Sequence, residues 1–424
     1  MIEIKPVSKI NATVNVPGSK SLTQRALIAA ALADGESILL GPLESEDTRY
    51  TSAALEQMGV TVEKGMDKWI IQGNGGRIAT PDKEIFLGNN GTATRFLTSV
   101  AALGAGTFQI TGDERMAERP ILPLMQALEG WGVDISSINN DGCPPLLIKA
   151  NGLSGGKTIL PEGKSSQYLS SLLLVGPYAG QKALLDVEGA ILSLPYVIMT
   201  LAVMEAFGIR VEGNEALNSY AIPQGTYNAR EYAIEGDASN ASYFYAAAAV
   251  TGGEVTVPNV PVPSLQGDAV FVALLARMGC HINKTGEGLT VSGPEELKGI
   301  TIDMGDMPDV VPTLAVVASQ AKGRTTIKNI AHLRIKECDR LHVMAVELAK
   351  MGARVQELDD TLIIEGKDPD NPMHGAEINT YNDHRIAMSF GVAGLAVPGV
   401  KILGEECVAK SCPDFWERFQ LLYS

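Results

Sequence analysis

The chain has 424 residues, 45% of them hydrophobic and 20% charged, which is the composition of a globular protein and at this length predicts two or three domains. Its formal net charge of −15 and its 5% content of aromatic residues argue against nucleic-acid binding, which needs an excess of cations or stacking side chains. No apolar run is long enough to cross a membrane and no signal peptide follows Met1, so a cytoplasmic protein is expected.

Two series of predicted helices, each ending in glycine, recur along the chain. Ala-rich helices are expected to end at Gly35, Gly106, Gly180, Gly253, Gly323 and Gly399. More amphipathic helices are expected to end at Gly59, Gly132, Gly208, Gly279 and Gly352. Glycine after a helix is a C-cap signal, since that position favours positive φ. Both series repeat after roughly 70 residues, which predicts six similar units of two helices and several strands, the sixth cut short at the C-terminus.

The Ala-rich helices are apolar on all sides, as in residues 26–33, 243–250 and 314–318. Helices of this kind are buried. A unit of this size is too small to bury both of its helices alone, so the units should group three and three about residue 235. The sequence therefore predicts an α/β protein with three buried helices in each half.

Polar residues gather where the buried helices begin. The clusters are Gly18-Ser-Lys-Ser21, Gly88-Asn-Asn-Gly-Thr92, Ser165-Ser-Gln167, Gly236-Asp-Ala-Ser239, Met307-Pro-Asp309 and Tyr381-Asn-Asp-His-Arg385. Ser, Asn and Asp in these places are also ordinary helix N-caps. Cations are less ordinary there, because they oppose the helix dipole, and they occur at Lys20, Arg25, Arg95 and Arg385. They indicate that an anion lies between the cations and the helix N–H groups.

Three further stretches carry charge that fits either an anion site or a solvated surface. Arg115 and Arg119 lie close together before Pro120. In the run from Arg334 to Leu341, Lys336 and Arg340 share one helix face beside Glu337, and Lys410 stands near the C-terminus. No phosphate-binding loop, zinc-protease or serine-hydrolase motif is present, and the five cysteines form no metal-type pair. Neither a metal nor an organic cofactor is expected.

The motifs in their order resemble the 5-enolpyruvylshikimate-3-phosphate (EPSP) synthase family over essentially the whole chain. The matching stretches are Pro17-Gly-Ser-Lys-Ser21 with Arg25, Leu87-Gly-Asn-Asn-Gly-Thr-Ala93, Glu118-Arg-Pro120, Ser165-Ser-Gln167, Glu235-Gly-Asp-Ala-Ser239, Arg334-Ile-Lys-Glu337 through Asp339-Arg340, Tyr381-Asn-Asp-His-Arg385 and Ala409-Lys410. Each stretch is weak alone, but the ordered set is specific.

The resemblance implies an enolpyruvyl transferase fold, an inside-out α/β barrel of two similar domains, each with three βαβαββ units around buried parallel helices. Residues 18–235 would form one domain, and residues 1–17 with 236–424 the other, with the active site in the cleft between them. The implied reaction transfers enolpyruvyl from phosphoenolpyruvate to the 5-hydroxyl of shikimate 3-phosphate and releases phosphate, a step of the shikimate pathway toward chorismate and the aromatic amino acids. A monomer without cofactor would suffice.

The resemblance also implies the site residues. Shikimate 3-phosphate would contact Lys20, Ser21, Arg25, Ser165, Ser166, Gln167, Ser193, Tyr196, Asp309, His332 and Lys336. Phosphoenolpyruvate would contact Lys20, Asn89, Gly91, Thr92, Arg119, Gln167, Lys336, Arg340, His384, Arg385 and Lys410. Lys20, Asp309 and Glu337 would be catalytic. These residue types suit the chemistry, because two anionic substrates need cations, and the proton transfers need two carboxyls in different protonation states.

Departures from the family pattern and two alternatives remain. Asn90 and Phe96 stand where many members have Ala and Pro, which leaves glyphosate sensitivity open. One alternative is UDP-N-acetylglucosamine enolpyruvyl transferase, which usually carries a Cys where this chain has Glu114. The other is a non-catalytic repeat scaffold for an acidic partner, which the charge of −15 disfavours.

Overall fold

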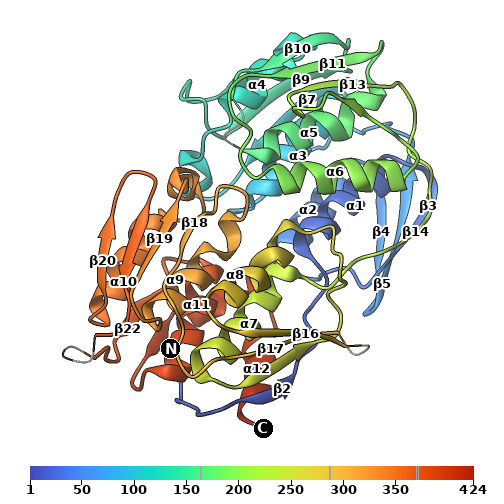
Figure 1. The fold of residues 1–424 in the computed structure, drawn as a ribbon. Coiled ribbons are helices and arrows are strands. Elements are labelled where there is room, and N and C mark those ends of the chain that lie inside the picture. Colours follow the sequence, from blue (N-terminus) through green and yellow to red (C-terminus); the bar gives the residue numbers. More distant parts are fainter. Residues whose placement is uncertain (163–164, 286–287, 369, 371) are drawn as a thin grey trace. The chain divides into compact units, whose positions relative to one another are not determined.

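The computed structural model of the protein describes residues 1–162, 165–285, 288–368, 370 and 372–424. The chain divides into two compact units (Figure 1). One is Gly18–Ile234, and the other combines Met1–Pro17 with Glu235–Ser424. The polypeptide therefore crosses between the units twice. We call Gly18–Ile234 the middle unit and the other the terminal unit.

The middle unit contains three four-stranded sheets with one topology. In the strand orders given below, the first two strands of each sheet are parallel to each other. The other neighbouring pairs are antiparallel. The first sheet runs β14 (Glu231–Ala233), β3 (Asp34–Leu40), β5 (Lys68–Asn74), β4 (Thr61–Lys64). The second runs β6 (Ile85–Phe86), β7 (Ala105–Thr111), β9 (Leu146–Asn151), β8 (Asp134–Ser137). The third runs β10 (Gly156–Leu160), β11 (Ala183–Val187), β13 (Ser219–Ile222), β12 (Glu212–Gly213).

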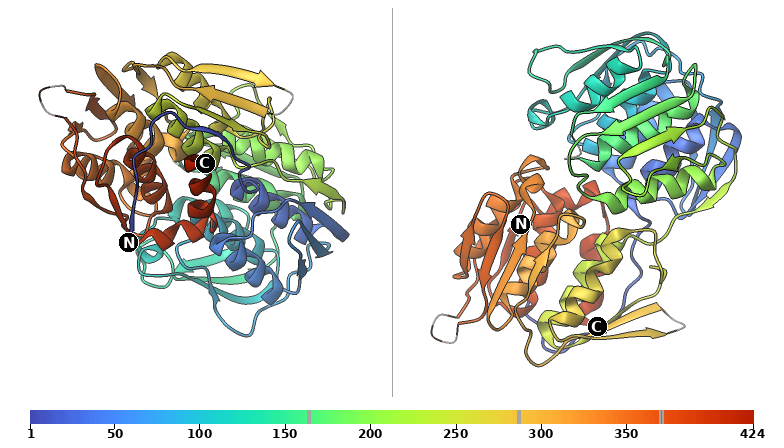
Figure 2. Two further views of the ribbon diagram at one scale, coloured as in Figure 1. Left: turned by 90° about the horizontal axis from the view of Figure 1, so that it is seen from below. Right: turned by 45° about the horizontal axis from the view of Figure 1, so that its top comes forward.

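The terminal unit repeats this topology twice and then shortens it. Its full sheets are β2 (Asn11–Thr13), β15 (Glu254–Val257), β17 (Gly288–Ser292), β16 (His281–Thr285), and β18 (Thr301–Asp303), β19 (Arg324–Lys328), β21 (Leu362–Glu365), β20 (Arg354–Glu357). The last sheet has β22 (Glu377–Asn379) and β23 (Lys401–Leu403), with β1 (Ile2–Glu3) in place of a hairpin. The N-terminal segment thus runs beside the last repeat (Figure 2). The Tyr423 hydroxyl also donates a hydrogen bond to the Lys5 carbonyl.

Along the chain, one helix follows the first strand of each repeat and one follows the second. The strands β2, before α1, and β14, before α7, each pair in a sheet of the other unit. The first helices are α1 (Lys20–Leu32), α3 (Gly91–Ala101), α5 (Ser166–Val175), α7 (Ala238–Thr251), α9 (Val311–Ser319) and α11 (His384–Ala396). The second helices are α2 (Glu46–Gln57), α4 (Leu122–Gly130), α6 (Leu194–Ala206), α8 (Phe271–Arg277), α10 (Arg340–Lys350) and α12 (Phe415–Gln420). Six βαβαββ repeats, the last one short, are what the sequence predicts, and this prediction is confirmed.

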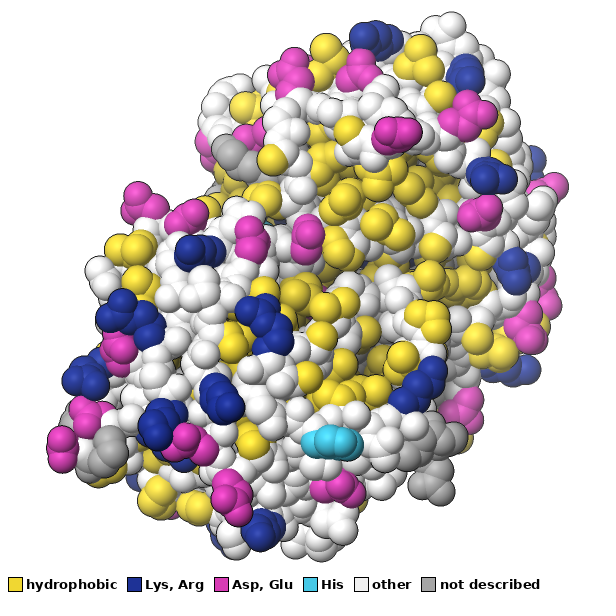
Figure 3. Space-filling view, viewed as in Figure 1, with side chains coloured by type: hydrophobic (Ala, Val, Ile, Leu, Met, Phe, Trp, Pro, Cys, Tyr) yellow, Lys and Arg dark blue, Asp and Glu magenta, His cyan; other side chains and the backbone are white. Residues whose placement is uncertain are grey.

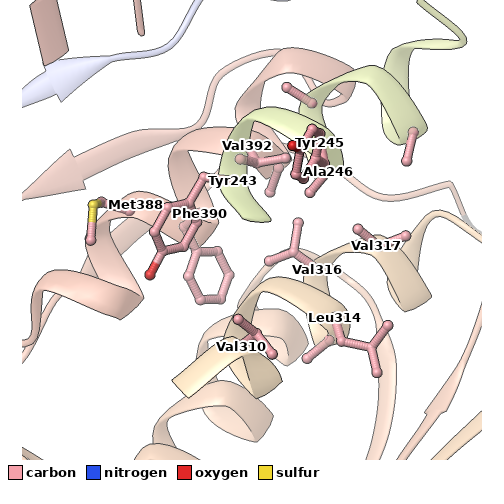
Figure 4. Close-up of a cluster of buried hydrophobic side chains, with 14 of the residues drawn as sticks. Tyr243, Tyr245, Ala246, Val310, Leu314, Val316, Val317, Met388, Phe390 and Val392 are labelled. Atoms are coloured by element: carbon pink, nitrogen blue, oxygen red, sulfur yellow. The ribbon is translucent and has the colours of Figure 1, made fainter. Parts of the chain in front are cut away.

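The first helices form the cores of the two units, as their all-round apolar sequences predict. Nearly every residue of α1, α3 and α5 is buried in the core of the middle unit, and the same holds for α7, α9 and α11 in the terminal unit. Figure 4 shows how Tyr243, Val316 and Phe390 converge from three such helices. The many Ala side chains let these helices pack closely. Among the described residues, no sheet closes into a barrel.

The predicted glycine ends are confirmed for the amphipathic helices and are wrong for the Ala-rich helices. All five glycines of the amphipathic series have φ between +85° and +109°, as expected for C-caps. The Ala-rich helices end before their predicted glycines, so that Gly35 and Gly106 lie inside β3 and β7. Helix α7 ends at Thr251 with Gly252 (φ +65°) as its C-cap, and a Cβ on Gly253 would lie 2.4 Å from the Ile10 backbone. Gly253 is therefore required by close packing. None of the helices in the described part of the chain is long and apolar enough to span a membrane.

Candidate active site

The starts of the three buried helices of the middle unit lie together at one end. Gln167 at the start of α5 donates to the Thr92 hydroxyl at the start of α3, at 3.1 Å. Gln24 in the first turns of α1 donates to the side-chain oxygen of Asn90, at 3.4 Å. The free N–H groups of these helices therefore point toward one region, which is a favourable environment for an anion.

Lys20, the first residue of α1, is paired with a carboxylate that the sequence analysis does not assign. Its ammonium lies 2.9 Å from the Asp47 carboxylate, and the two side chains are only 12% and 3% exposed. The backbone carbonyl of Asp47 accepts a hydrogen bond from the Asn90 amide at 2.7 Å. Asn90 also caps α3 by accepting from the Ala93 N–H at 3.0 Å, so its side chain is a structural link between α2 and α3.

Arg25 is buried inside the middle unit without a carboxylate partner among the described residues. Its guanidinium donates to the Thr200 hydroxyl at 2.7 Å and lies over the rings of Phe96 and Tyr196, with distances of 5.3 and 5.8 Å to their centroids. Burial lowers its pKa to about 10, partly offset by Tyr196. Arg25 remains a cation at neutral pH, and a buried cation of this kind is stabilised by an anionic ligand.

Arg119 is held by the loop that leads into α3. It donates to the backbone and side-chain oxygens of Asn89 at 3.2 and 2.9 Å. Arg95 stabilises the segment that carries Arg119, because its guanidinium donates to the Pro120 carbonyl at 2.8 Å. Burial, and next the charge of Arg119, lower the pKa of Arg95 to about 10. The two guanidiniums are thus neighbours, and the repulsion between them favours an anion beside Arg119.

Gly91 is the place where this loop has no room for a side chain. A Cβ on Gly91 would lie 2.4 Å from a terminal nitrogen of Arg119. Gly91→Ala should therefore displace the Arg119 guanidinium and weaken the binding of an anionic substrate. The KM should rise by about 10- to 100-fold, because one charge-assisted hydrogen bond is lost. Steady-state kinetics check this result. Gly180→Ala is the matched control, because its Cβ would meet only ordinary contacts at 3.5 Å.

The remaining predicted residues of the middle unit also lie at helix starts. Ser165 caps α5 by accepting from the Gln167 N–H at 3.3 Å, and Ser166 is buried beside it. Ser193 begins α6 with φ +57°, an uncommon left-handed conformation for a serine, and is buried. Ser21 lies in the first turn of α1, and its carbonyl accepts from Arg25 at 3.0 Å.

In the terminal unit the helix starts also lie together. Arg385 in the first turn of α11 contacts the Tyr243 hydroxyl on α7 at 3.5 Å and the Asp309 carboxylate, just before α9, at 2.5 Å. The hydroxyls of Ser242 on α7 and Thr313 on α9 are 3.1 Å apart. The terminal unit thus gathers its three buried helices at one polar end, as the middle unit does.

Arg340 is the centre of this polar end. Its side chain is 1% exposed and donates to three carboxylates, those of Asp383 at 2.7 and 3.2 Å, Glu337 at 2.7 Å and Asp309 at 3.2 Å. Burial disfavours its charge, but the three carboxylates outweigh burial and raise its pKa. Asp309 bridges Arg340 and Arg385, and Glu337 pairs with Arg340 from the position just before α10. The two candidate proton-transfer carboxyls therefore have different surroundings.

Three further predicted residues belong to the same end of the terminal unit. Lys336 directly precedes Glu337, and the buried Lys410 ends the short helix Glu405–Lys410. His384 is fully buried as the first residue of α11, 3.8 Å from the carboxylate of Asp383. Asp383 caps α11 by accepting from the Arg385 N–H at 2.9 Å. Asp383 lies within one of the motifs of the sequence but has no predicted role, because an Asp before a helix is an ordinary cap.

His332 is a buried imidazole whose two ring nitrogens have no hydrogen-bond partner among the described residues. Burial and the charge of Lys336 lower its pKa to about 3. His332 is thus neutral at physiological pH and can donate to a ligand through one nitrogen. This fits a contact with a substrate oxygen.

The depressed pKa of His332 predicts a dependence of stability on pH. In the unfolded chain the imidazole titrates near 6.5. Its contribution to the free energy of unfolding is therefore complete above pH 6.5. It is lost as the pH falls toward 3, because only the unfolded chain binds the proton in this range. At pH 5 the loss should be about 2 kcal/mol. Urea unfolding of wild type and His332→Asn at pH 8 and pH 5 should show this difference. His281→Asn, at an exposed histidine on β16, should leave the pH dependence of wild type unchanged.

The two units together define a class of protein. Each is built of βαβαββ repeats, and each presents cations, hydroxyls and amides or carboxylates at the starts of its buried helices, which is the architecture of the enolpyruvyl transferases. Among the described residues no cluster of His, Cys, Asp or Glu could hold a metal ion.

The chain belongs to the EPSP synthase (3-phosphoshikimate 1-carboxyvinyltransferase) family, whose model matches residues 4–419. It is 43% identical over 422 residues to the 3-phosphoshikimate 1-carboxyvinyltransferase of Nostoc punctiforme, covering 99% of this chain and 98% of the relative. It is 44% identical over 421 residues to that of Syntrophobacter fumaroxidans, covering 99% of both. A solved EPSP synthase of Acinetobacter baumannii superimposes with a TM-score of 0.81 at 30% identity, over 99% of this chain and 97% of that one.

Proposed function

We propose that this chain transfers the enolpyruvyl group of phosphoenolpyruvate to the 5-hydroxyl of shikimate 3-phosphate, giving 5-enolpyruvylshikimate 3-phosphate and phosphate. One observation carries the proposal beyond the family match. Arg25 and Arg119 are cations with no carboxylate partner among the described residues, whereas Arg340 and Arg385 hold carboxylates in place. The first kind suits binding of anionic substrates, and the second suits positioning of groups that transfer protons.

The middle unit is proposed to bind shikimate 3-phosphate. The hydroxyls of Ser165 and Ser166 and the amide of Gln167 sit at the start of α5, where helix N–H groups favour a phosphate. The Arg25 guanidinium lies over the ring of Tyr196, which belongs to the first turn of α6 and closely follows Ser193. Lys20, Ser21 and, from the terminal unit, Asp309, His332 and Lys336 complete the proposed set.

Phosphoenolpyruvate is proposed to bind between cations of both units. Asn89, Gly91, Thr92, Arg119 and Gln167 would contribute from the middle unit with Lys20, and Lys336, Arg340, His384, Arg385 and Lys410 from the terminal unit. The cations would neutralise its phosphate and carboxylate. An oxygen-bound phosphate surrounded by cations is also a better leaving group, since the developing negative charge is stabilised.

The reaction is proposed to pass through a tetrahedral adduct. Glu337 protonates the methylene carbon of phosphoenolpyruvate while Asp309, assisted by Lys20, accepts the proton of the attacking 5-hydroxyl. The new carbon–oxygen bond gives the adduct, which then loses phosphate and a methyl proton to restore the double bond. Asp309 bonds two arginines, and their positive charges favour a negatively charged carboxylate. A charged carboxylate suits the role of proton acceptor.

A phosphate-release assay tests the function. With phosphoenolpyruvate and shikimate 3-phosphate the protein should release phosphate and form the enolpyruvyl ether, detected by phosphorus NMR. Replacing shikimate 3-phosphate with UDP-N-acetylglucosamine should stop phosphate release. Release with the nucleotide sugar but not with shikimate 3-phosphate would assign the alternative transferase activity, and release with neither would contradict both.

The two units are further proposed to act as two domains, approximately 18–235 and 1–17 with 236–424, that close over the substrates. The protein is proposed to be a cytoplasmic monomer. The proposed substrate sets include residues of both units, so the substrates would supply contacts that favour closure. Small-angle X-ray scattering should show a smaller radius of gyration after shikimate 3-phosphate and phosphoenolpyruvate are added. An unchanged radius at saturating substrates would contradict closure.

A further inference from the structure

A cavity of about 260 Å³ lies in the terminal unit beside the start of α7. Its walls come from α7, from residues 260–272 and from β17. Among the described residues, none assigned to either substrate lines it. Apolar side chains gather on the surface over α8 and the preceding loop (Figure 3), where Val262, Leu265 and Val270 are exposed. A cavity with an apolar surround of this kind is typical of a small-molecule site.

The Tyr245 hydroxyl is the polar group that this cavity leaves unsatisfied. Tyr245 lines the cavity and is 4% exposed, and its hydroxyl has no hydrogen-bond partner among the described residues. Figure 4 shows Tyr245 and Tyr243 on different sides of α7, so Tyr245 does not share the contacts of Tyr243 with Arg385. Burial raises the pKa of Tyr245, which keeps the hydroxyl protonated and able to donate. An unsatisfied buried hydroxyl costs about 1–3 kcal/mol.

A water molecule is a poor partner for this hydroxyl. A buried water usually makes about three hydrogen bonds. The wall around Tyr245 is mostly apolar and includes Ala241, Val260, Phe271 and Leu289. A molecule with an apolar body and one hydrogen-bond acceptor would satisfy the hydroxyl and fill the remaining space.

The charge and size of the cavity narrow the class of ligand. No Lys or Arg among the described residues lines it, and its acidic group is Asp268, which accepts a hydrogen bond from Ser239. The lining offers an anion no compensating cation, and burial raises the pKa of Asp268 itself to about 7, so an uncharged ligand is favoured. An apolar protein cavity of about 150 Å³ holds benzene, so this one has room for a substituted single ring. We propose that the cavity binds a small neutral molecule with one aromatic ring and an acceptor for the Tyr245 hydroxyl.

The cavity wall is joined to the second crossing between the units. The Glu235 carboxylate accepts from the Ser264 hydroxyl at 2.6 Å and from the Leu265 N–H at 3.2 Å. Gln266 donates to the Gly236 carbonyl at 2.8 Å and accepts from the Ala238 N–H at 3.0 Å. A ligand that fixes the loop 260–266 therefore also fixes the crossing and the start of α7. Occupancy of the cavity lowers turnover, a consequence that rests on the proposed function.

Acetophenone and isopropylbenzene are suitable probes, because they have similar shapes and only acetophenone has a carbonyl acceptor. Calorimetric titration of the full chain should show saturable binding of acetophenone, about two- to tenfold tighter than isopropylbenzene, as one hydrogen bond predicts. Tyr245→Phe should remove this difference and retain binding of both probes. The site would be overturned if neither probe showed saturable binding. It would also be overturned if Tyr245→Phe still preferred acetophenone to isopropylbenzene as strongly as wild type does.

A second pair of variants tests the location without relying on a buried residue. Ala269→Phe, at a half-buried wall position, should fill the cavity and abolish binding of acetophenone. Ala276→Phe, at an exposed position of α8, is the matched control and should bind it as wild type does. Acetophenone should lower turnover in wild type and Ala276→Phe but not in Ala269→Phe. Binding that survives in Ala269→Phe would overturn the location, and binding without a change in turnover would overturn the coupling to the crossing.

Discussion

Glu337→Gln is expected to lower turnover by about 10²- to 10⁴-fold, the usual contribution of a positioned acid–base group. The substitution retains the shape of the side chain and its hydrogen bond with Arg340, which is 2.7 Å in the wild type. It removes only the proton that the proposed mechanism transfers to the methylene carbon. Shikimate 3-phosphate should therefore still bind, with a Kd within a few-fold of wild type by calorimetry.

A matched control for this variant exists in the same unit. Glu357 also bonds an arginine, Arg334 at 2.7 Å, but it is partly exposed on β20, and no proton-transfer role is proposed for it. Glu357→Gln should leave turnover within about twofold, since exposed ion pairs contribute little. Near-normal turnover of Glu337→Gln, or a defect confined to substrate binding, would show that another group is the proton donor.

Asp383→Ala is expected to destabilise the terminal unit by about 3–5 kcal/mol, the usual cost of breaking a buried ion pair. Asp383 is fully buried, bonds Arg340 through both carboxylate oxygens and caps α11. Without the Asp383 carboxylate, the guanidinium of Arg340 still pairs with Glu337 and Asp309 but loses its most buried partner. Urea unfolding should show the loss as a lower midpoint.

Asp414→Ala is the control for this stability prediction. Asp414 pairs with Arg418 at 2.6 Å, but both side chains are partly exposed, and the pair is an i,i+4 contact near the C-terminus. Its removal should cost less than about 1 kcal/mol. Equal losses for the two variants would mean that burial does not determine the strength of the Asp383 pair.

The sequence alone determined the repeat and the helices. The two glycine series and the all-round apolar helices are local patterns, because a C-cap or a buried helix face is read from neighbouring residues. They correctly predicted six units with three buried helices in each half. The residues of the candidate site were named through the ordered motifs, and the structure gathers them within each unit at the helix starts.

Which strands pair and which charges meet depends on how the repeats pack, and no local pattern shows it. Strand β14 pairs with β3, and β2 with β15, across most of a unit's length, and no local pattern indicates such partners. The carboxylates of Asp47 and Asp383 look like ordinary residues near helix starts, yet they hold Lys20 and Arg340 from 27 and 43 residues away. Pairing of this kind depends on how the repeats pack, and a buried charge finds its partner only when packing has removed the water around both.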